Sequence, residues 1–138
     1  MRFEPIEHTA DLSFRAYGAS LEELFENAAF GMFSMVCEID DAMPLPVRRE
    51  VRLSATDLVR LLRLWLAELL FLHESQRILF CRFEVSFPEE GALEGIAEGM
   101  DASAVQPASM APFKAVTYHG LGVHRTPEGY EATIILDT

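Results

Sequence analysis

The segment from Leu58 to Leu72 constrains the fold most, because its apolar residues leave almost no polar side on a helix. Residues at helical spacing form one apolar face: Leu58, Leu61, Leu62, Trp65, Leu66, Leu69 and Leu72. Others occupy the remaining sides: Val59, Leu64, Leu70 and Phe71. Thr56 is predicted to cap this helix, with Asp57 in its first turn. Such a helix is either the buried centre of the fold or a cover over a sheet that also contacts a partner, and we favour the buried centre.

The other periodic segments predict one more helix and several strands. Ser20 and Glu23 form a capping box that opens a helix reaching residue 36, which an acidic loop follows. Alternating apolar residues predict strands over 12–17, 47–54, 79–87 and 92–100, and a hairpin pairing 121–125 with 130–136. Residues 88–91 are a predicted hairpin turn, 101–113 a loop, and 114–119 a further ordered piece. This pattern is typical of an α+β two-layer sandwich with a mostly antiparallel, hairpin-rich sheet packed by two long helices.

Length and composition indicate one globular domain. The chain has 138 residues, half of them hydrophobic, which is the size of a single compact domain spanning residues 1–138. Residues Met1–Pro5 contain no apolar stretch of the signal-peptide type, and arginines and a glutamate interrupt the 58–72 segment, so we expect neither a secretory signal nor a membrane span. Cys37 and Cys81 lack metal-ligand spacing and are predicted to be buried free thiols in a reducing cytoplasm.

The charge balance narrows the classes of partner. Twenty-two acidic residues against eleven basic ones give a net charge of −11. A free-standing nucleic-acid binder needs the opposite surplus, so we expect contact with RNA only through another protein. The acidic surplus suits a hard divalent cation or a basic protein partner.

Candidate chemical groups are few. The chain contains no nucleophile elbow, phosphate-binding glycine loop or HExxH motif. Carboxylates stand instead at the ends of predicted elements: Asp11, Glu38, Asp40, Asp41 and Asp137. Such groups could converge on one hard cation, or they could form a solvated acidic surface, and spacing alone leaves both open. Lys114 is the only lysine among eleven basic residues, which indicates either a site that needs a compact ammonium group or a chance occurrence.

Several blocks together resemble the archease family along nearly the whole chain. They are Glu7-His8-Thr9-Ala10-Asp11-Leu12, Arg15-Ala16-Tyr17-Gly18, residues 21–29, Asp57-Leu58-Val59, residues 65–70, Lys114-Ala115-Val116-Thr117-Tyr118-His119 and Ile134-Ile135-Leu136-Asp137. The HTAD block and the KAVTYH block are the most specific parts of the resemblance.

The resemblance implies an accessory protein, not an enzyme. Archeases assist the RtcB-type RNA ligase in tRNA splicing and RNA repair by promoting its metal- and GTP-dependent guanylylation and its multiple turnover. The resemblance further implies that Asp11, Glu38 and Asp137 bind a divalent ion, Ca²⁺ or Mn²⁺, and that Lys114 acts on the ligase. The family usually has Met-Thr-Asp where this chain has Val36-Cys37-Glu38, so Asp40 is an alternative third ligand.

Two other functions remain as alternatives. One is an independent metal-dependent hydrolase or nuclease that uses Asp11, Glu38 and Asp137. It is disfavoured because no histidine or second carboxylate pair is obviously placed to act as a general base. The other is a chaperone-like interaction module whose acidic residues are only solvated surface.

Overall fold

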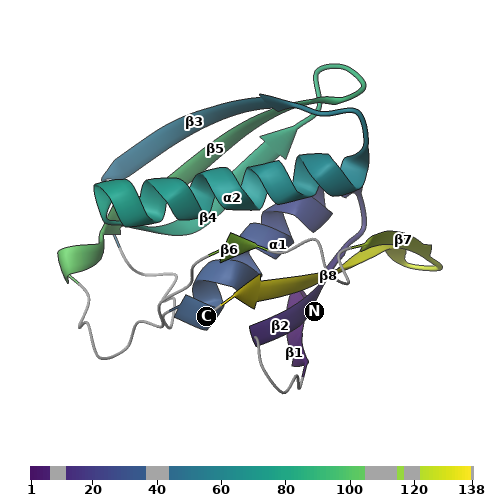
Figure 1. Ribbon diagram of the computed structural model, residues 1–138, viewed down its shortest axis with the longest axis horizontal. Coiled ribbons are helices and arrows are strands. Elements are labelled where there is room, and N and C mark those ends of the chain that lie inside the picture. Colours follow the sequence, from purple (N-terminus) through teal and green to yellow (C-terminus); the bar gives the residue numbers. More distant parts are fainter. Residues whose placement is uncertain (7–11, 37–43, 105–114, 117–121, 138) are drawn as a thin grey trace.

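The computed structural model describes residues 1–6, 12–36, 44–104, 115–116 and 122–137 (Figure 1). In chain order the elements are β1 (Phe3–Ile6), β2 (Leu12–Gly18), α1 (Leu21–Val36), β3 (Val47–Ser54), α2 (Leu58–Gln76), β4 (Ile78–Ser86), β5 (Ala92–Asp101), the 3-10 turn η1 (Ala102–Ala104), β6 (Ala115–Val116), β7 (Gly122–Thr126) and β8 (Gly129–Asp137). The described elements confirm the predicted α+β class.

The strands divide into two antiparallel sheets instead of forming one. The first has the order β1-β2-β8-β6, with β7 also paired to β8, and the second has the order β3-β5-β4. Figure 1 shows the second sheet above, β8, β2 and β1 below, and α2 lying across the front. Helix α1 packs against both β2 and β4, so it joins the two sheets through one core.

Aromatic side chains fill the space between the two helices and the second sheet. Phe33 of α1 stacks on Phe83 of β4 with ring centroids 5.8 Å apart, and Trp65 of α2 packs edge-on against the same Phe83 ring. The Trp65 indole N–H also donates a 3.0 Å hydrogen bond to the Phe25 carbonyl oxygen, so the largest buried side chain leaves no buried donor unpaired. Gly95 of β5 faces this indole, and a Cβ there would lie 2.5 Å from a Trp65 ring carbon. The tight packing of α2 on β5 therefore requires glycine at this position.

The helix starts confirm one predicted cap and correct the other. The Ser20 hydroxyl accepts from the Glu23 amide at 3.1 Å, as the capping box predicts, while the Glu23 carboxylate reaches back to the Ala19 amide. The prediction that Thr56 caps the second helix is wrong. Asp57 is the N-cap, since its carboxylate accepts from the Arg60 amide at 2.8 Å. This helix continues past the apolar segment to Gln76, and Arg77 after it adopts a left-handed φ of 55°.

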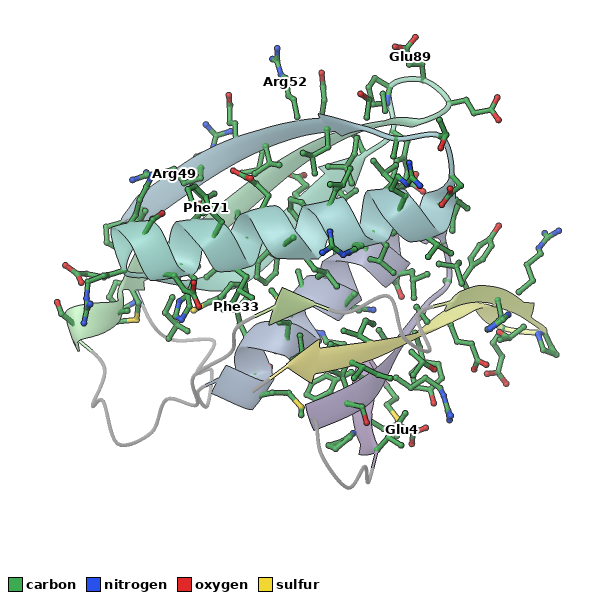
Figure 2. All side chains as sticks on the ribbon, in the orientation of Figure 1. Glu4, Phe33, Arg49, Arg52, Phe71 and Glu89 are labelled. Carbon is green, nitrogen blue, oxygen red and sulfur yellow. The ribbon has the colours of Figure 1, made fainter. Side chains whose placement is uncertain are left out.

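Helix α2 is buried on one side only. Its inward face is covered completely or nearly so, at Leu61, Leu62, Trp65, Leu66, Leu69, Leu70 and Leu72. Leu58 and Phe71 are exposed, with 61% of the Phe71 surface accessible, and Figure 2 labels Phe71 on α2. The favoured interpretation of α2 as the buried centre therefore fails on this outer face. No helix within the described ranges is long and apolar enough to cross a membrane.

The remaining differences from the sequence predictions are local. Strand β1 is absent from the sequence predictions. It contains Pro5, which is tolerated because β1 is an edge strand. The predicted loop over 101–113 begins later, since Asp101 belongs to β5 and η1 follows; residues 105–113 lie outside the described part of the chain. The turn after β4 is confirmed, with Gly91 at a φ of 80°.

Candidate functional site

The carboxyl end of β8 lies between the start of β2 and the short strand β6. Leu12 pairs with Leu136, and Ala115 pairs with Asp137. Antiparallel neighbours lie about 5 Å apart, so three segments that are distant in the sequence meet at this point. We call this meeting point of β2, β8 and β6 the strand-end junction.

Buried residues hold the strand-end junction on a rigid base. Ile134 and Leu136 of β8 are fully buried, and Ile135 is nearly so. Ser13, also buried, pairs with Ile6 and donates a 3.1 Å hydrogen bond from its hydroxyl to the Ile6 carbonyl oxygen. The two strand ends on either side of residues 7–11 are thereby tied to each other.

Of the predicted site residues, only Asp137 lies in the part of the chain that the structure describes. For Asp137 the structure gives the backbone, which forms the last pair of β8 with β6. The other four predicted carboxylates and the lysine lie outside the described residues: Asp11, Glu38, Asp40, Asp41 and Lys114. Among the side chains that are described, no group of three or more His, Cys, Asp and Glu could hold a metal ion.

One histidine and one cysteine among the described residues have structural surroundings. The His73 ring lies 2.7 Å from the Ile78 carbonyl oxygen and packs edge-on against Phe33, as expected for a structural histidine in the last turn of a helix. Cys81 is only half-buried, whereas it was predicted to be buried. His8, Cys37 and His119 lie outside the described residues.

A polar cluster on the first sheet was missed because it depends on β1. Glu4 accepts hydrogen bonds from both the Tyr17 hydroxyl and the Arg15 guanidinium, the latter at 3.2 Å. The bond to Glu4 raises the pKa of the Tyr17 hydroxyl, and burial adds to that shift. The signal available in the sequence was a glutamate inside a short Phe-Glu-Pro-Ile segment, which the proline concealed.

Glu26 on α1 has a half-buried carboxylate that contacts the second sheet. It accepts a 2.9 Å hydrogen bond from the Val85 amide at the outer edge of β4. Burial raises its pKa, this hydrogen bond partly opposes the shift, and the nearby negative charges of Glu23, Glu84 and Glu22 add to it. The contact closes the edge of β4 against further strand pairing, so its role is structural.

A hollow of about 450 Å³ lies at the end of β2 opposite the strand-end junction. Its lining includes Tyr17, Tyr130, Glu23 and Glu128. None of the predicted site residues lines it.

Known proteins match this chain along almost all of its length. The model of the Archease protein family (MTH1598/TM1083) matches residues 3–138. Protein archease of Methanosarcina mazei is 37% identical over 140 residues, covering 99% of this chain and 95% of that protein. Protein archease of Sulfurisphaera tokodaii is 36% identical, covering 99% of this chain and 98% of that protein.

Two solved structures share the fold. The solution structure of protein 1598 of Methanobacterium thermoautotrophicum has a TM-score of 0.84 and 35% sequence identity, with 99% of each chain covered. The crystal structure of an archease of Thermotoga maritima, described as a possible chaperone, has a TM-score of 0.66. At 22% identity, with 98% of this chain and 96% of that chain covered, this second likeness concerns the fold alone. Given a family model that spans residues 3–138 and relatives above 30% identity over nearly their full length, the chain belongs to the archease family.

Proposed function

We propose that this protein is a non-enzymatic activator of an RtcB-type RNA ligase, acting in the cytoplasm in tRNA splicing or RNA repair. It promotes the metal- and GTP-dependent guanylylation of the ligase and allows repeated turnover. Membership of the archease family supports this role, because activation of that ligase is what the family resemblance implies.

The strand-end junction is the observation that carries the proposal. Asp11 directly precedes Leu12, and Lys114 directly precedes Ala115, so each is one residue from a strand that pairs with the end of β8. One residue spans about 3.8 Å of chain, which limits how far either can be from the backbone of Asp137. Sheet register therefore supports a site assembled from Asp11, Asp137 and Lys114.

The donor set fits a hard divalent cation. Asp11 and Asp137, with Glu38 or Asp40 as the third ligand, supply only carboxylate oxygens, which Ca²⁺ and Mn²⁺ accept. When bound, the ion supplies positive charge that neutralises carboxylates and phosphates. Lys114 brings a compact ammonium group to the same region, where it contacts a phosphate or a ligase carboxylate.

The net charge supports docking on a protein, not on RNA. A surplus of eleven acidic residues is attracted to the basic surface that an RNA ligase needs for its substrate. Contact with RNA is then indirect, through the ligase.

A guanylylation assay tests the proposal. Ligase, GTP and Mn²⁺ are incubated with and without this protein, and covalent GMP on the ligase is measured. We expect stimulation by the wild type and its loss in Asp11→Asn and Asp137→Asn. Glu89→Gln is the matched control: it removes the same charge from an exposed turn between β4 and β5, so it should activate normally. The Ca²⁺-induced rise in melting temperature, lost in both aspartate variants only, gives a second readout.

The other outcomes distinguish the alternatives. Hydrolysis of RNA or nucleotide by this protein alone would favour the metal-dependent hydrolase. Suppression of aggregation of unrelated unfolded proteins, without any effect on guanylylation, would favour the chaperone-like module that the description of the Thermotoga maritima structure names.

A further inference from the structure

A regular row of side chains runs along the outer face of α2. Arg60, Leu64, Ala67, Phe71 and Glu74 follow one another in steps of four, three, four and three residues, which places them on one side of a helix. Arg60, Phe71 and Glu74 are exposed, and Leu64 and Ala67 are half-buried between them. Figure 1 shows no other labelled element drawn over this helix.

The row is complementary to itself when it is reversed about Ala67. Arg60 and Glu74 each lie seven residues from Ala67, about 10 Å along the axis. A second copy of the helix running in the opposite direction brings Arg60 opposite the partner's Glu74. Leu64 meets the partner's Phe71 to within one residue, and the small side chain of Ala67 lets the two helices approach closely at the crossing point.

The charge distribution allows two acidic molecules to meet on this side. Residues 47–82, which form β3, α2 and the start of β4, contain seven of the eleven basic residues but only four of the twenty-two acidic ones. The rest of the chain therefore carries all of the negative surplus. Approach through α2 keeps the acidic remainder of the two molecules apart, so the long-range repulsion is smallest there.

We propose that this protein self-associates through an antiparallel α2–α2 contact with a two-fold axis at Ala67. Phe71 is the apolar anchor, and two symmetric Arg60–Glu74 pairs set the orientation. One helix from each copy makes a small interface compared with the about 1,600 Å² of a standard one, so the dimer is weak and depends on protein concentration.

Sedimentation velocity from ~1 μM to ~1 mM protein measures the association directly, because a weak dimer has a dissociation constant in this range. We expect a monomer–dimer equilibrium for the wild type. Phe71→Ser should raise the dissociation constant at least tenfold, and circular dichroism should show an unchanged fold because Phe71 is exposed.

A charge exchange tests the orientation. Arg60→Glu alone and Glu74→Arg alone should each weaken the dimer, and the double variant Arg60→Glu/Glu74→Arg should restore it, since the paired charges are then exchanged. Arg52→Glu on the opposite face of the second sheet is the matched control and should leave association unchanged. A protein that stays monomeric at the highest concentration overturns the proposal. So does a dimer that Phe71→Ser leaves intact, or a double variant that fails to recover.

Discussion

At the scale of single residues, Glu26 is the described carboxylate whose environment most opposes its charge. Burial raises its pKa above the ordinary value for glutamate, although the Val85 amide donates to it. A carboxyl group with a higher pKa in the folded protein than in the unfolded chain binds its proton more tightly when folded. Its contribution therefore favours folding below the unfolded pKa and is lost as the pH rises through the folded pKa.

Glu26→Gln should therefore stabilise the protein slightly at pH 7. The amide oxygen still accepts from Val85, while the negative charge beside Glu23, Glu84 and Glu22 is removed. Because Glu26 is only half-buried, solvent screens its charge in part, and we expect a gain of less than about 1 kcal/mol in the free energy of unfolding. Glu26→Ala should instead cost about 1–3 kcal/mol, since it leaves the Val85 amide without this partner. Denaturant melts at pH 5 and pH 7 measure both; a glutamine variant less stable than wild type at pH 7 would contradict the argument.

Lys114→Arg should impair activation of the ligase even though the charge is kept. Ten of the eleven basic residues are arginine, so the lysine at the start of the KAVTYH block indicates a need for a compact ammonium group. If Lys114 contacts a phosphate or a carboxylate in the ligase complex, the broader planar guanidinium is misplaced there. Titrating the ligase with wild type and variant measures the effect. Equal guanylylation at saturation would leave Lys114 with no more than a peripheral ion pair, worth about 0–1 kcal/mol.

At the scale of elements, the start of α2 depends on one carboxylate. Asp57 has extended backbone angles and accepts from the Arg60 amide, so it satisfies one of the unpaired donors of the first turn. Asp57→Ala should lower the free energy of unfolding by about 1 kcal/mol. Thr56→Ala is the matched control, because Thr56 lies one residue outside the helix, and it should change stability by less than about 0.5 kcal/mol. If Thr56→Ala lowers the free energy of unfolding as much as Asp57→Ala does in chemical denaturation, Asp57 is not the dominant N-cap.

The elements that the sequence predicted well are those with a long, unambiguous period. Helix α1 and strand β3 start and end within one residue of the prediction, because their apolar residues repeat regularly and caps or turns bound them. β1 was missed because Pro5 disfavours a strand, and only pairing with β2 overrides that preference. The exposure of the outer face of α2 was not predicted. The sequence shows that the helix is apolar on nearly all sides, but not which side the rest of the molecule covers.

The candidate site was less predictable from spacing than the fold. Spacing left the carboxylates of Asp11 and Asp137 open between a metal site and a solvated surface, since 125 residues separate them in the sequence. The family resemblance connected them, and the pairing of Leu12 with Leu136 gives that connection a physical basis. Sheet pairing between distant segments is a tertiary property, and no local pattern encodes it.

At the scale of the whole molecule, the surplus of eleven negative charges opposes the compact state. The exposed ion pairs offset this repulsion only slightly: Arg52–Glu94 and Arg82–Glu98 both have closest N–O distances of 3.8 Å and largely exposed arginines. Salt screens both effects, but the repulsion involves many more charges. Raising NaCl from ~20 mM to ~500 mM, in the presence of a chelator, should therefore raise the melting temperature by about 2–5 °C.

The double variant Glu89→Gln/Glu90→Gln separates this repulsion from other effects of salt. Both glutamates are exposed in the turn between β4 and β5, where Figure 2 shows Glu89 pointing away from the body of the molecule. Removing two of these charges should raise the melting temperature at low salt and reduce the further gain on adding NaCl, because less repulsion is left to screen. Scanning calorimetry at the two salt concentrations measures both quantities. A melting temperature that falls with salt in the wild type would mean that the surface ion pairs outweigh the net charge.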